Sequence, residues 1–331
     1  MRKFLLPLRS REKGFLVALA LAAVTLAIVP YVSSSYTINA MRDAMVLGLF
    51  ALSYDLIWGK TSTLTLGHAV FFGTGAYTLA ITTVQYGVAP WLGAVAGICS
   101  AALLAWVVGY FLLYAGVRSQ FLAVISLAVL LIVRQIATSW RSVTGGDVGI
   151  LGIPPLILGG IDLSGAVASY FAALTLLTVA LLGCWIALRG TYGKVLAAIG
   201  MNEFRAKHCG FNTAFHLLTM FIVSASLAGL AGALYASMAG VVAPDLFSIL
   251  LSTDVVLWVA IGGKGSLLGP VIASILLIRV QQEVSSYAAD LWPLILGVVF
   301  LFFVLVLPKG LSGLIAWGSR KAGRRTVSVA K

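Results

Sequence analysis

The sequence predicts an all-α integral membrane protein with about ten transmembrane helices. Its 331 residues are 61% hydrophobic and only 10% charged, whereas a soluble domain carries about 25% charged residues. So few charges could not cover a globular surface, and the apolar runs are long enough to cross a hydrocarbon core of roughly 30 Å. The placement of the basic residues leads independently to the same class.

Ten apolar segments predict the individual spans. They cover residues 14–30, 41–58, 64–85, 90–115, 119–139, 166–188, 215–239, 248–262, 267–286 and 290–307. The expected organisation is a basic N-terminal segment at 1–13, a polytopic transmembrane domain at 14–308 and a basic tail at 309–331. The N-terminal segment also resembles the start of a signal peptide, but no small-x-small cleavage site follows, so we expect an uncleaved first helix.

The basic residues favour one orientation in the membrane. If the N-terminus is cytoplasmic and the spans alternate, 18 of the 22 Lys and Arg residues fall in cytoplasmic segments. They comprise five in 1–13, four in 189–214, six in 309–331, and Lys60, Arg118 and Lys264. Membrane proteins carry an excess of basic residues on the cytoplasmic side, so both termini are expected there.

Three stretches interrupt the helical pattern because they are rich in glycine, proline or small polar residues. They are residues 59–77, 141–165 and 262–270, and their composition is typical of turns and loops. Irregular backbone at membrane depth must be buried in protein or line a wet cavity. Breaks in both halves of a transporter are typical of the transport pathway, so 59–77 and 262–270 are candidates for lining one.

Several other function classes are disfavoured. Residues 59–61 read Gly-Lys-Thr, like the end of a phosphate-binding P-loop, but Tyr54 stands where the motif requires glycine. No Ser-His-Asp or Cys-His set, paired-carboxylate arrangement or HExxH motif is present, so the sequence does not predict an enzyme, a metal site or a cofactor. The net charge of +12 comes without a basic stripe of interleaved aromatic residues, so nucleic-acid binding is not expected.

A series of motifs, in order over roughly residues 40–315, resembles one family. They are Ser62-x-x-x-x-Gly67-His68-Ala69-x-Phe71-Phe72-Gly73-x-Gly75-Ala76-Tyr77, Thr144-Gly145-Gly146-x-x-Gly149, Asn202-Glu203-x-x-Ala206-x-x-x-Gly210, Ala228-Gly229-x-Ala231-Gly232-Ala233-Leu234-Tyr235, Gly262-Gly263-x-Gly265-Ser266-x-x-Gly269-Pro270 and Pro308-Lys309-Gly310-Leu311. Together they resemble the LivM-type permeases of branched-chain amino acid ABC importers.

The resemblance implies an ABC-importer permease fold in the bacterial inner membrane, in contact with lipid. It also implies three kinds of protein partner: a second, LivH-type permease, two cytoplasmic ABC ATPases and a periplasmic solute-binding protein. ATP hydrolysis would then belong to other chains, which agrees with the missing P-loop.

The segment before the first motif departs from the family pattern. Residues 55–62 read Asp-Leu-Ile-Trp-Gly-Lys-Thr-Ser, where the family usually has Asn-Leu-Leu-x-Gly-Tyr-Ala-Gly. This form, together with residues 257–263, looks closer to the urea and short-chain amide branch. Branched-chain amino acids are therefore the first expectation for the solute, with urea or an amide as the alternative. An ion-coupled secondary carrier and a passive channel are alternatives from other classes.

Two sets of residues are candidates for function. Those expected along the translocation pathway lie in the breaks or are ionisable within apolar segments: Asp55, Thr65, Gly67, His68, Gly73, Thr74, Asp254 and Ser266. For the ionisable ones, a polar path and simple pairing or snorkelling toward the interface both remain open. His68 could accept or donate a hydrogen bond in a pathway, or pair with nearby backbone.

The longest internal polar connection on the predicted cytoplasmic side is 189–214, which can form one or two short helices with Gly193, Gly200 and Gly210 as breaks. ATP-driven motion has to reach the spans through a structured cytoplasmic element, so this connection is expected to dock on the ATPase. The residues assigned to this coupling are Gly193, Asn202, Glu203, Arg205, Ala206 and Gly210. A simple connector is the alternative.

Overall fold

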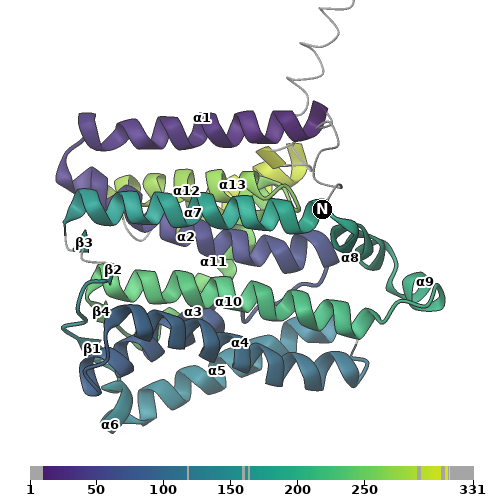
Figure 1. Cartoon of the computed structure of the whole chain (residues 1–331), viewed down its shortest axis with the longest axis horizontal. Helices are drawn as coiled ribbons and strands as arrows, with labels where there is room; N and C mark the ends of the chain where they lie inside the picture. Colours follow the sequence, from purple (N-terminus) through teal and green to yellow (C-terminus); the bar gives the residue numbers. More distant parts are fainter. Residues whose placement is uncertain are drawn as a thin grey trace, which may run out of the picture.

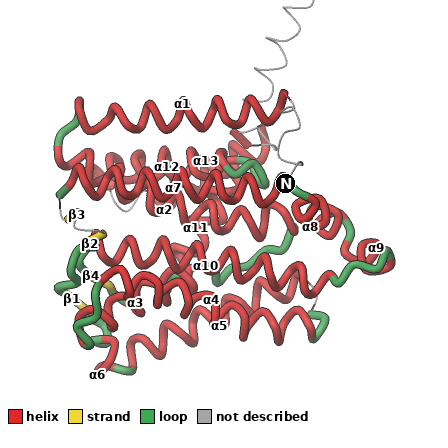
Figure 2. Tube along the Cα trace, viewed as in Figure 1, coloured by secondary structure: helices red, strands yellow, loops and turns green. Residues whose placement is uncertain are grey.

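The computed structural model describes residues 10–117, 119–158, 161–162, 165–288, 292–306, 310–311 and 313. Within these residues the chain is a bundle of helices that run mostly along one long axis (Figure 1). Loops and short strands gather at the two ends of the helices (Figure 2). The basic segments expected at 1–13 and 309–331 lie almost wholly outside the described residues.

Each of the ten expected segments corresponds to a helix. The helices are α1 (Ser10–Val32), α2 (Ser35–Thr61), α3 (Ala69–Ala80), α4 (Pro90–Tyr114), α5 (Ser119–Ser139), α7 (Ala166–Arg189), α10 (Thr213–Ala239), α11 (Ile249–Gly262), α12 (Leu268–Ala288) and α13 (Trp292–Val306). A π-helical turn, η2 (Ile81–Gln85), continues α3. Among the described residues, five helices are long and apolar enough to cross a membrane: α1, α4, α5, α7 and α10.

One end of the bundle carries short strands, and we call it the strand end. It holds α6 (Arg141–Thr144), β1 (Ile150–Leu151), β2 (Ile157–Leu158), β3 (Ile161–Asp162) and β4 (Val241–Val242). The 3-10 turn η3 (Pro244–Phe247) follows β4 and leads back into the bundle beside α3. β1 pairs antiparallel with β4, with Ile150 opposite Val242, and β2 pairs with β3. The expectation that 141–165 forms no continuous helix is confirmed.

The opposite end carries two short helices, α8 (Thr191–Met201) and α9 (Glu203–His208), which project beyond the bundle (Figure 1). We call residues 190–212 the knob, and this end the knob end. Lys60 donates to the Gly265 carbonyl at this end, over 2.8 Å, whereas Gln85 donates to the Val143 carbonyl at the strand end. Successive connections between the long helices therefore lie alternately at the knob end and at the strand end.

Helices α2 and α10 form the centre of the bundle. Each has 27 residues, and they run in opposite directions, α2 toward the knob end and α10 toward the strand end (Figure 1). Nearly every side chain from Ala44 to Ile57 is buried. A buried polar or charged side chain in this stretch must find its partners inside the protein.

Glycines allow α3, α4 and α10 to pack closely. A Cβ on Gly75 would collide with the backbone of Gly229, and one on Gly232 would collide with the Phe72 carbonyl. A Cβ on Gly97 would lie 2.7 Å from the Gly75 oxygen. Small residues at such spacing let helix backbones approach in membranes, so the small residues of α10 serve packing within this chain.

Two details of the sequence prediction are wrong. The irregular backbone expected over 59–77 is confined to residues 62–68, since α2 continues to Thr61 and α3 begins at Ala69. Within the knob, Gly193 and Gly200 lie inside α8, and the division between α8 and α9 falls at Asn202. These glycines make room for neighbouring backbone atoms, whereas Gly210 does form a break, with φ +86°.

We expect Gly75→Ala to lower thermal stability, because its methyl group would push α3 away from the Gly229 backbone. Overpacking of this kind costs about 1–3 kcal/mol. The measurement is the Tm of the purified protein in detergent. Gly183→Ala in α7 is the matched control, since a Cβ there meets nothing within 4 Å. Equal Tm values for the two variants would contradict the packing argument.

Candidate functional site

The first break, residues 62–68, folds back along α2 into the interior. Helix α2 ends at Ser62, whose φ of 59° is left-handed. The Tyr54 hydroxyl donates to the Thr65 carbonyl over 2.9 Å, and His68 Nε2 lies 3.0 Å from Ser53 Oγ. Ser53 precedes the end of α2 by about two turns, or ~12 Å. Helix α3 therefore begins deep inside the bundle.

Side chains of other helices satisfy the backbone of this break. The amides of Leu66 and Gly67 donate to Ser126 Oγ of α5, over 3.0 and 3.3 Å. The Ala69 amide donates to Ser252 Oγ of α11 over 3.1 Å. No side chain fits at Gly67, because its Cβ would collide with the Ser126 carbonyl. The break is thus a buried, fixed structure, as irregular backbone at membrane depth requires.

His68 sits in an aromatic cage and has no exposed surface. Its ring lies 5.5 Å from the rings of Phe50 and Phe71 and 5.2 Å from that of Tyr54. Its Nδ1 atom and Thr65 Oγ1 are buried without a hydrogen-bond partner among the described residues. Such atoms are uncommon in proteins because each loses its hydrogen bonds to water and gains none within the protein. The two atoms offer hydrogen-bonding capacity for water or a polar solute.

Helix α11 also begins inside the bundle and runs opposite to α3. Ser248 caps its start by accepting from the Leu251 amide over 3.1 Å. The preceding Phe247 stacks on Tyr77 of α3, with ring centroids 5.4 Å apart, and fills the space beside Gly73. Two half-length helices thus start in the interior and run to opposite ends. Helix N-termini carry partial positive charge, and transporters use such broken helices to bind solutes.

The other pathway candidates on these helices lie apart from the His68 cage. Thr74 is half-buried and bonds to the Val70 carbonyl of its own helix over 2.7 Å. Asp254 in α11 is only 9% exposed, and the described residues give its carboxylate no hydrogen-bond or ion-pair partner. Of the eight candidates, the structure brings Thr65, Gly67 and His68 together and places Gly73 and Thr74 along the following helix.

The second break, residues 263–267, is held by Asp55 and Lys60 of α2, a group we call the clamp. The Asp55 carboxylate accepts from the amides of Gly265 and Leu267, over 2.6 and 3.0 Å, and is fully buried. The ammonium of Lys60 donates to the Gly265 carbonyl over 2.8 Å. Ser266 accepts from the Gly269 amide over 3.1 Å and so caps α12. Asp55 and Ser266 therefore organise the knob-end break.

A second lysine, Lys264, connects the second break to the end of α2. Lys264 Nζ lies 3.3 Å from Ser62 Oγ and 5.3 Å from the Trp58 ring centroid. Burial lowers the pKa of Lys264, and the Asp55 carboxylate opposes this shift. Gly59-Lys60 at the end of α2 and Gly263-Lys264 in the second break thus lie close together at the knob end.

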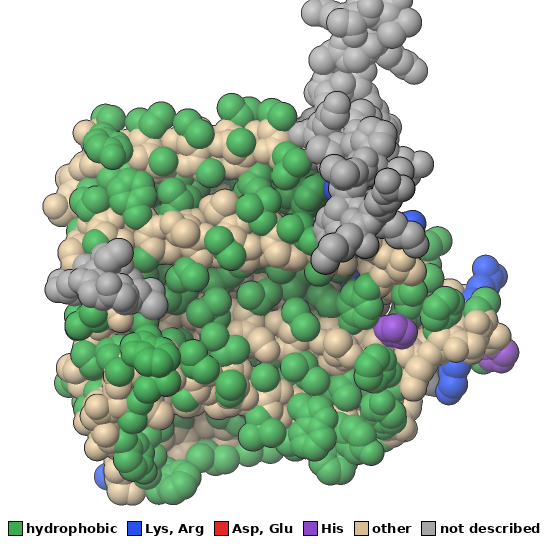
Figure 3. Space-filling model, in the orientation of Figure 1, with side chains coloured by type: hydrophobic (Ala, Val, Ile, Leu, Met, Phe, Trp, Pro, Cys, Tyr) green, Lys and Arg blue, Asp and Glu red, His purple; other side chains and the backbone are tan. Residues whose placement is uncertain are grey.

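The knob presents an ordered surface with mixed character. Asn202 Oδ1 accepts from the Arg205 amide over 2.9 Å and caps α9, while Ala206 is buried beneath it. Glu203 and Arg205 are exposed, and so are two apolar side chains, Met201 at 87% and Phe204 at 70%. Figure 3 shows Lys, Arg and His side chains gathered at this end, while hydrophobic side chains dominate the rest of the visible face.

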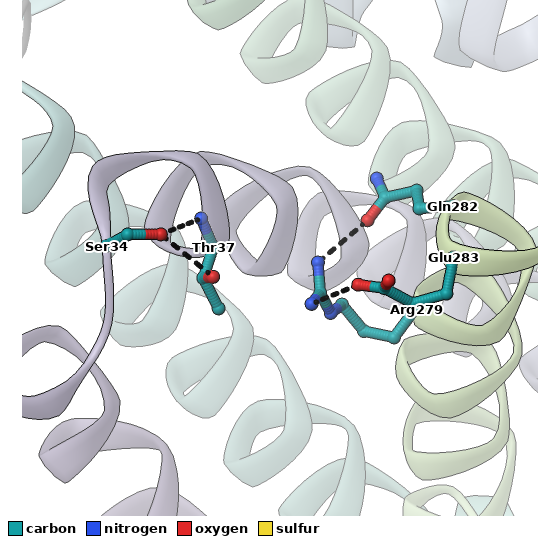
Figure 4. Close-up of polar contacts among 5 residues, drawn as sticks. All are labelled: Ser34, Thr37, Arg279, Gln282 and Glu283. Carbon is teal, nitrogen blue, oxygen red and sulfur yellow. Dashed lines mark hydrogen bonds and ion pairs between the residues drawn. The ribbon is translucent and has the colours of Figure 1, made fainter. Parts of the chain in front are cut away.

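Two arginines on other helices, Arg279 and Arg134, have partners close to them. Arg279 of α12 contacts Gln282 over 3.1 Å and Glu283 over 3.3 Å (Figure 4). Arg134 of α5 lies 3.5 Å from Asp245. Neither arginine approaches the His68 cage or the clamp through any contact in the described part of the chain.

Sequence reasoning missed the side chains that hold the breaks in place. They are Ser53, Tyr54, Lys60, Ser126 and Ser252. Ser126 and Ser252 stand within apolar segments, and a serine in such a place often bonds to backbone. The sequence therefore indicates that these serines bond to backbone, but it does not indicate which backbone groups they bond to.

This chain is similar to known permease proteins over most of its length. A family model described as the permease component of branched-chain amino acid transport systems matches residues 36–306. The high-affinity branched-chain amino acid transport system permease protein LivM of Escherichia coli is 29% identical over 93% of this chain and 78% of its own length. The corresponding LivH protein of Salmonella typhimurium is 24% identical over 84% of this chain and 96% of its own length. No solved structure gave a significant match. This chain belongs to the branched-chain amino acid transport permease family, and it is a multi-pass α-helical membrane permease.

Proposed function

We propose that this chain is the transmembrane subunit of an ATP-driven importer for branched-chain amino acids. The family membership supports the permease role, and the named relatives at 28% and 29% identity support the solute class. The structural observation that carries the proposal is the pair of half-length helices, α3 and α11. They meet where the Ala69 amide bonds to Ser252 Oγ, next to His68, and Nδ1 of His68 and Oγ1 of Thr65 are unpaired among the described residues. A zwitterionic solute needs polar groups of this kind within an apolar bundle.

The eight pathway candidates have different roles in this proposal. Thr65, Gly67 and His68 form the interior polar site, with Gly73 and Thr74 along its continuation toward the strand end. Asp254 provides a carboxylate on the facing half-helix. Asp55 and Ser266 act at the knob end, where they hold the backbone that closes the pathway. Because His68 is fully buried, the proposed pathway is shut in this conformation.

The partners proposed are a LivH-type permease, two cytoplasmic ATPases and a periplasmic solute-binding protein. The similarity of this chain to both LivM and LivH proteins supports a pair of permeases with a shared fold. The chain itself is proposed to carry no cofactor and no catalytic site. Its location would be the bacterial inner membrane.

The proposed orientation places the knob end in the cytoplasm. Lys60 and Lys264 lie at this end with the exposed basic residues of the knob, Lys194, Arg205 and Lys207. Cytoplasmic loops of membrane proteins carry such an excess of Lys and Arg. Both termini would then be cytoplasmic.

Urea or a short-chain amide is the second candidate solute, favoured by the Asp55-Leu56-Ile57-Trp58-Gly59 form of α2 shortly before the first break. Asp55 binds backbone amides of the second break. The departure from the family pattern therefore has a structural role that is independent of the solute.

Reconstitution tests the solute directly. We expect proteoliposomes with this chain, its permease partner, the ATPases and the binding protein to take up labelled leucine or valine when ATP is enclosed with the ATPases. A His68→Ala variant should lower uptake about tenfold or more, since it removes a buried polar group from the proposed site. Uptake of urea without uptake of leucine would select the alternative, and uptake driven by an ion gradient without ATP would overturn the importer assignment.

Docking of the knob is a separate prediction. Single cysteines at Glu203, Phe204 and Arg205, in a background without Cys99, Cys184 and Cys209, should crosslink to the ATPase in inside-out membrane vesicles. Reversing the charge of Glu203 or Arg205 should lower solute-stimulated ATP hydrolysis while membrane insertion stays normal. A cysteine at Val148, which is 70% exposed at the strand end, is the matched control and should not crosslink. Crosslinking at Val148 alone would reverse the proposed orientation.

A further inference from the structure

The last turn of α2, residues 58–61, touches the second break through backbone and side chains. A Cβ on Gly59 would lie 2.6 Å from the Gly265 amide nitrogen, so only glycine permits this approach. The Asp55 carboxylate and the Lys60 ammonium bind the amide and the carbonyl of the same residue, Gly265. The loop 263–267 is therefore fixed to α2 in both position and orientation.

The same turn also touches the knob. A Cβ on Gly200 of α8 would lie 2.5 Å from the Lys60 carbonyl oxygen and 3.2 Å from the Thr61 carbonyl carbon. Helix α8 therefore rests directly on the backbone of residues 60–61, with no side chain between them. Close-packed contacts of this kind transmit displacement because neither side can be compressed.

The turn also leads into the first break. Ser62 ends α2 in a left-handed conformation, and the chain then folds back to Thr65 and His68. One helical turn thus contacts the knob, holds the loop between α11 and α12, and begins the segment that carries the buried polar site.

We propose that the last turn of α2 is the element through which movement of the knob reaches both breaks, and that Lys60 is the positioning residue of this connection. The inference rests on the proposed function, since it presumes that the knob moves with an ATPase. When α8 shifts, residues 60–61 must shift with it. The bond from Lys60 to Gly265 then either carries loop 263–267 along or breaks, and either outcome changes the knob-end closure.

The chain offers a matched control for each part of the connection. Lys264 is the other lysine between the breaks, but it is exposed and its contact with Ser62 is longer, at 3.3 Å. Gly190 also belongs to the knob, but the nearest atom to its Cβ position, the Ala187 oxygen, is 3.8 Å away. Gly190 makes no close contact with α2, and the exposed side chain of Lys264 holds the second break to α2 less tightly than Lys60 does.

The test uses the reconstituted importer with Lys60→Met and Gly200→Ala, and with Lys264→Met and Gly190→Ala as controls. Three quantities are measured: recovery of the ATPases with the permease, solute uptake per ATP hydrolysed, and the rate at which a thiol reagent labels Ser266→Cys with and without nucleotide. The labelling uses a background without the native cysteines. It reports movement of the loop itself, which a merely structural defect elsewhere would not alter.

We expect Lys60→Met and Gly200→Ala to retain the ATPases but to lower uptake per ATP about tenfold. For Lys60→Met this is the effect of losing a hydrogen bond to a charged group, and for Gly200→Ala it is the effect of overpacking against the Lys60 carbonyl. The nucleotide-dependent change in Ser266→Cys labelling should disappear in both, while the controls remain within about twofold of the parent protein. Should Gly200→Ala fail to assemble, Lys60→Met alone decides the outcome.

Normal uptake by Lys60→Met, or an unchanged labelling response in it, would overturn the inference and leave the proposed function intact. If the parent importer takes up none of the tested solutes, the proposed function fails, and the inference fails with it.

Discussion

The structure depends on one constraint, which is that backbone inside an apolar bundle must find its hydrogen-bond partners within the protein. Continuous helices meet it internally, but the breaks at 62–68 and 263–267 do not. Each break is instead satisfied by side chains of distant helices, Ser126 and Ser252 for the first and Asp55 and Lys60 for the second. Because the partners belong to three different helices, α2, α5 and α11, the breaks fix how those helices pack.

The same constraint explains why a charged residue is retained in a buried position. An isolated carboxylate at Asp55 would be strongly destabilising, but two backbone amides within 3.0 Å offset its lost hydration. Those amides would otherwise be unpaired, so the carboxylate and the loop stabilise each other. His68 differs, because one of its ring nitrogens has a partner in Ser53 and the other has none in the described residues. The Asp55 carboxylate and its loop therefore satisfy each other, whereas His68 keeps one ring nitrogen available to hydrogen-bond a ligand.

Much of the fold could be predicted from the sequence, because apolar segments of membrane length need no knowledge of their neighbours. All ten expected segments correspond to helices. The limits of the breaks could not be predicted in the same way. Gly73 and Gly75 resemble loop residues by composition, yet they lie in α3, where Phe247 and the Gly229 backbone occupy the space beside them. A glycine required by close packing and a glycine required by a turn look alike until the opposing surface is known.

In the candidate site, too, the sequence indicates which residues are unusual but not what they contact. Asp55 and His68 stand out in the sequence as polar residues near a break, and that pattern assigns both to one pathway. Only the contacts separate them, since Asp55 bonds to Gly265, which is 210 positions away, and His68 is enclosed by aromatic rings of α2 and α3. Helix α2 nevertheless links them, because it carries both Asp55 and Ser53, the partner of His68. Ser53 and Asp55 lie within one turn of α2, so a displacement of that turn changes the interior site and the knob-end break together. The transport pathway that we propose must never open at both ends, which requires such mechanical dependence between its closures. In this proposal α2 supplies it through a single continuous helix.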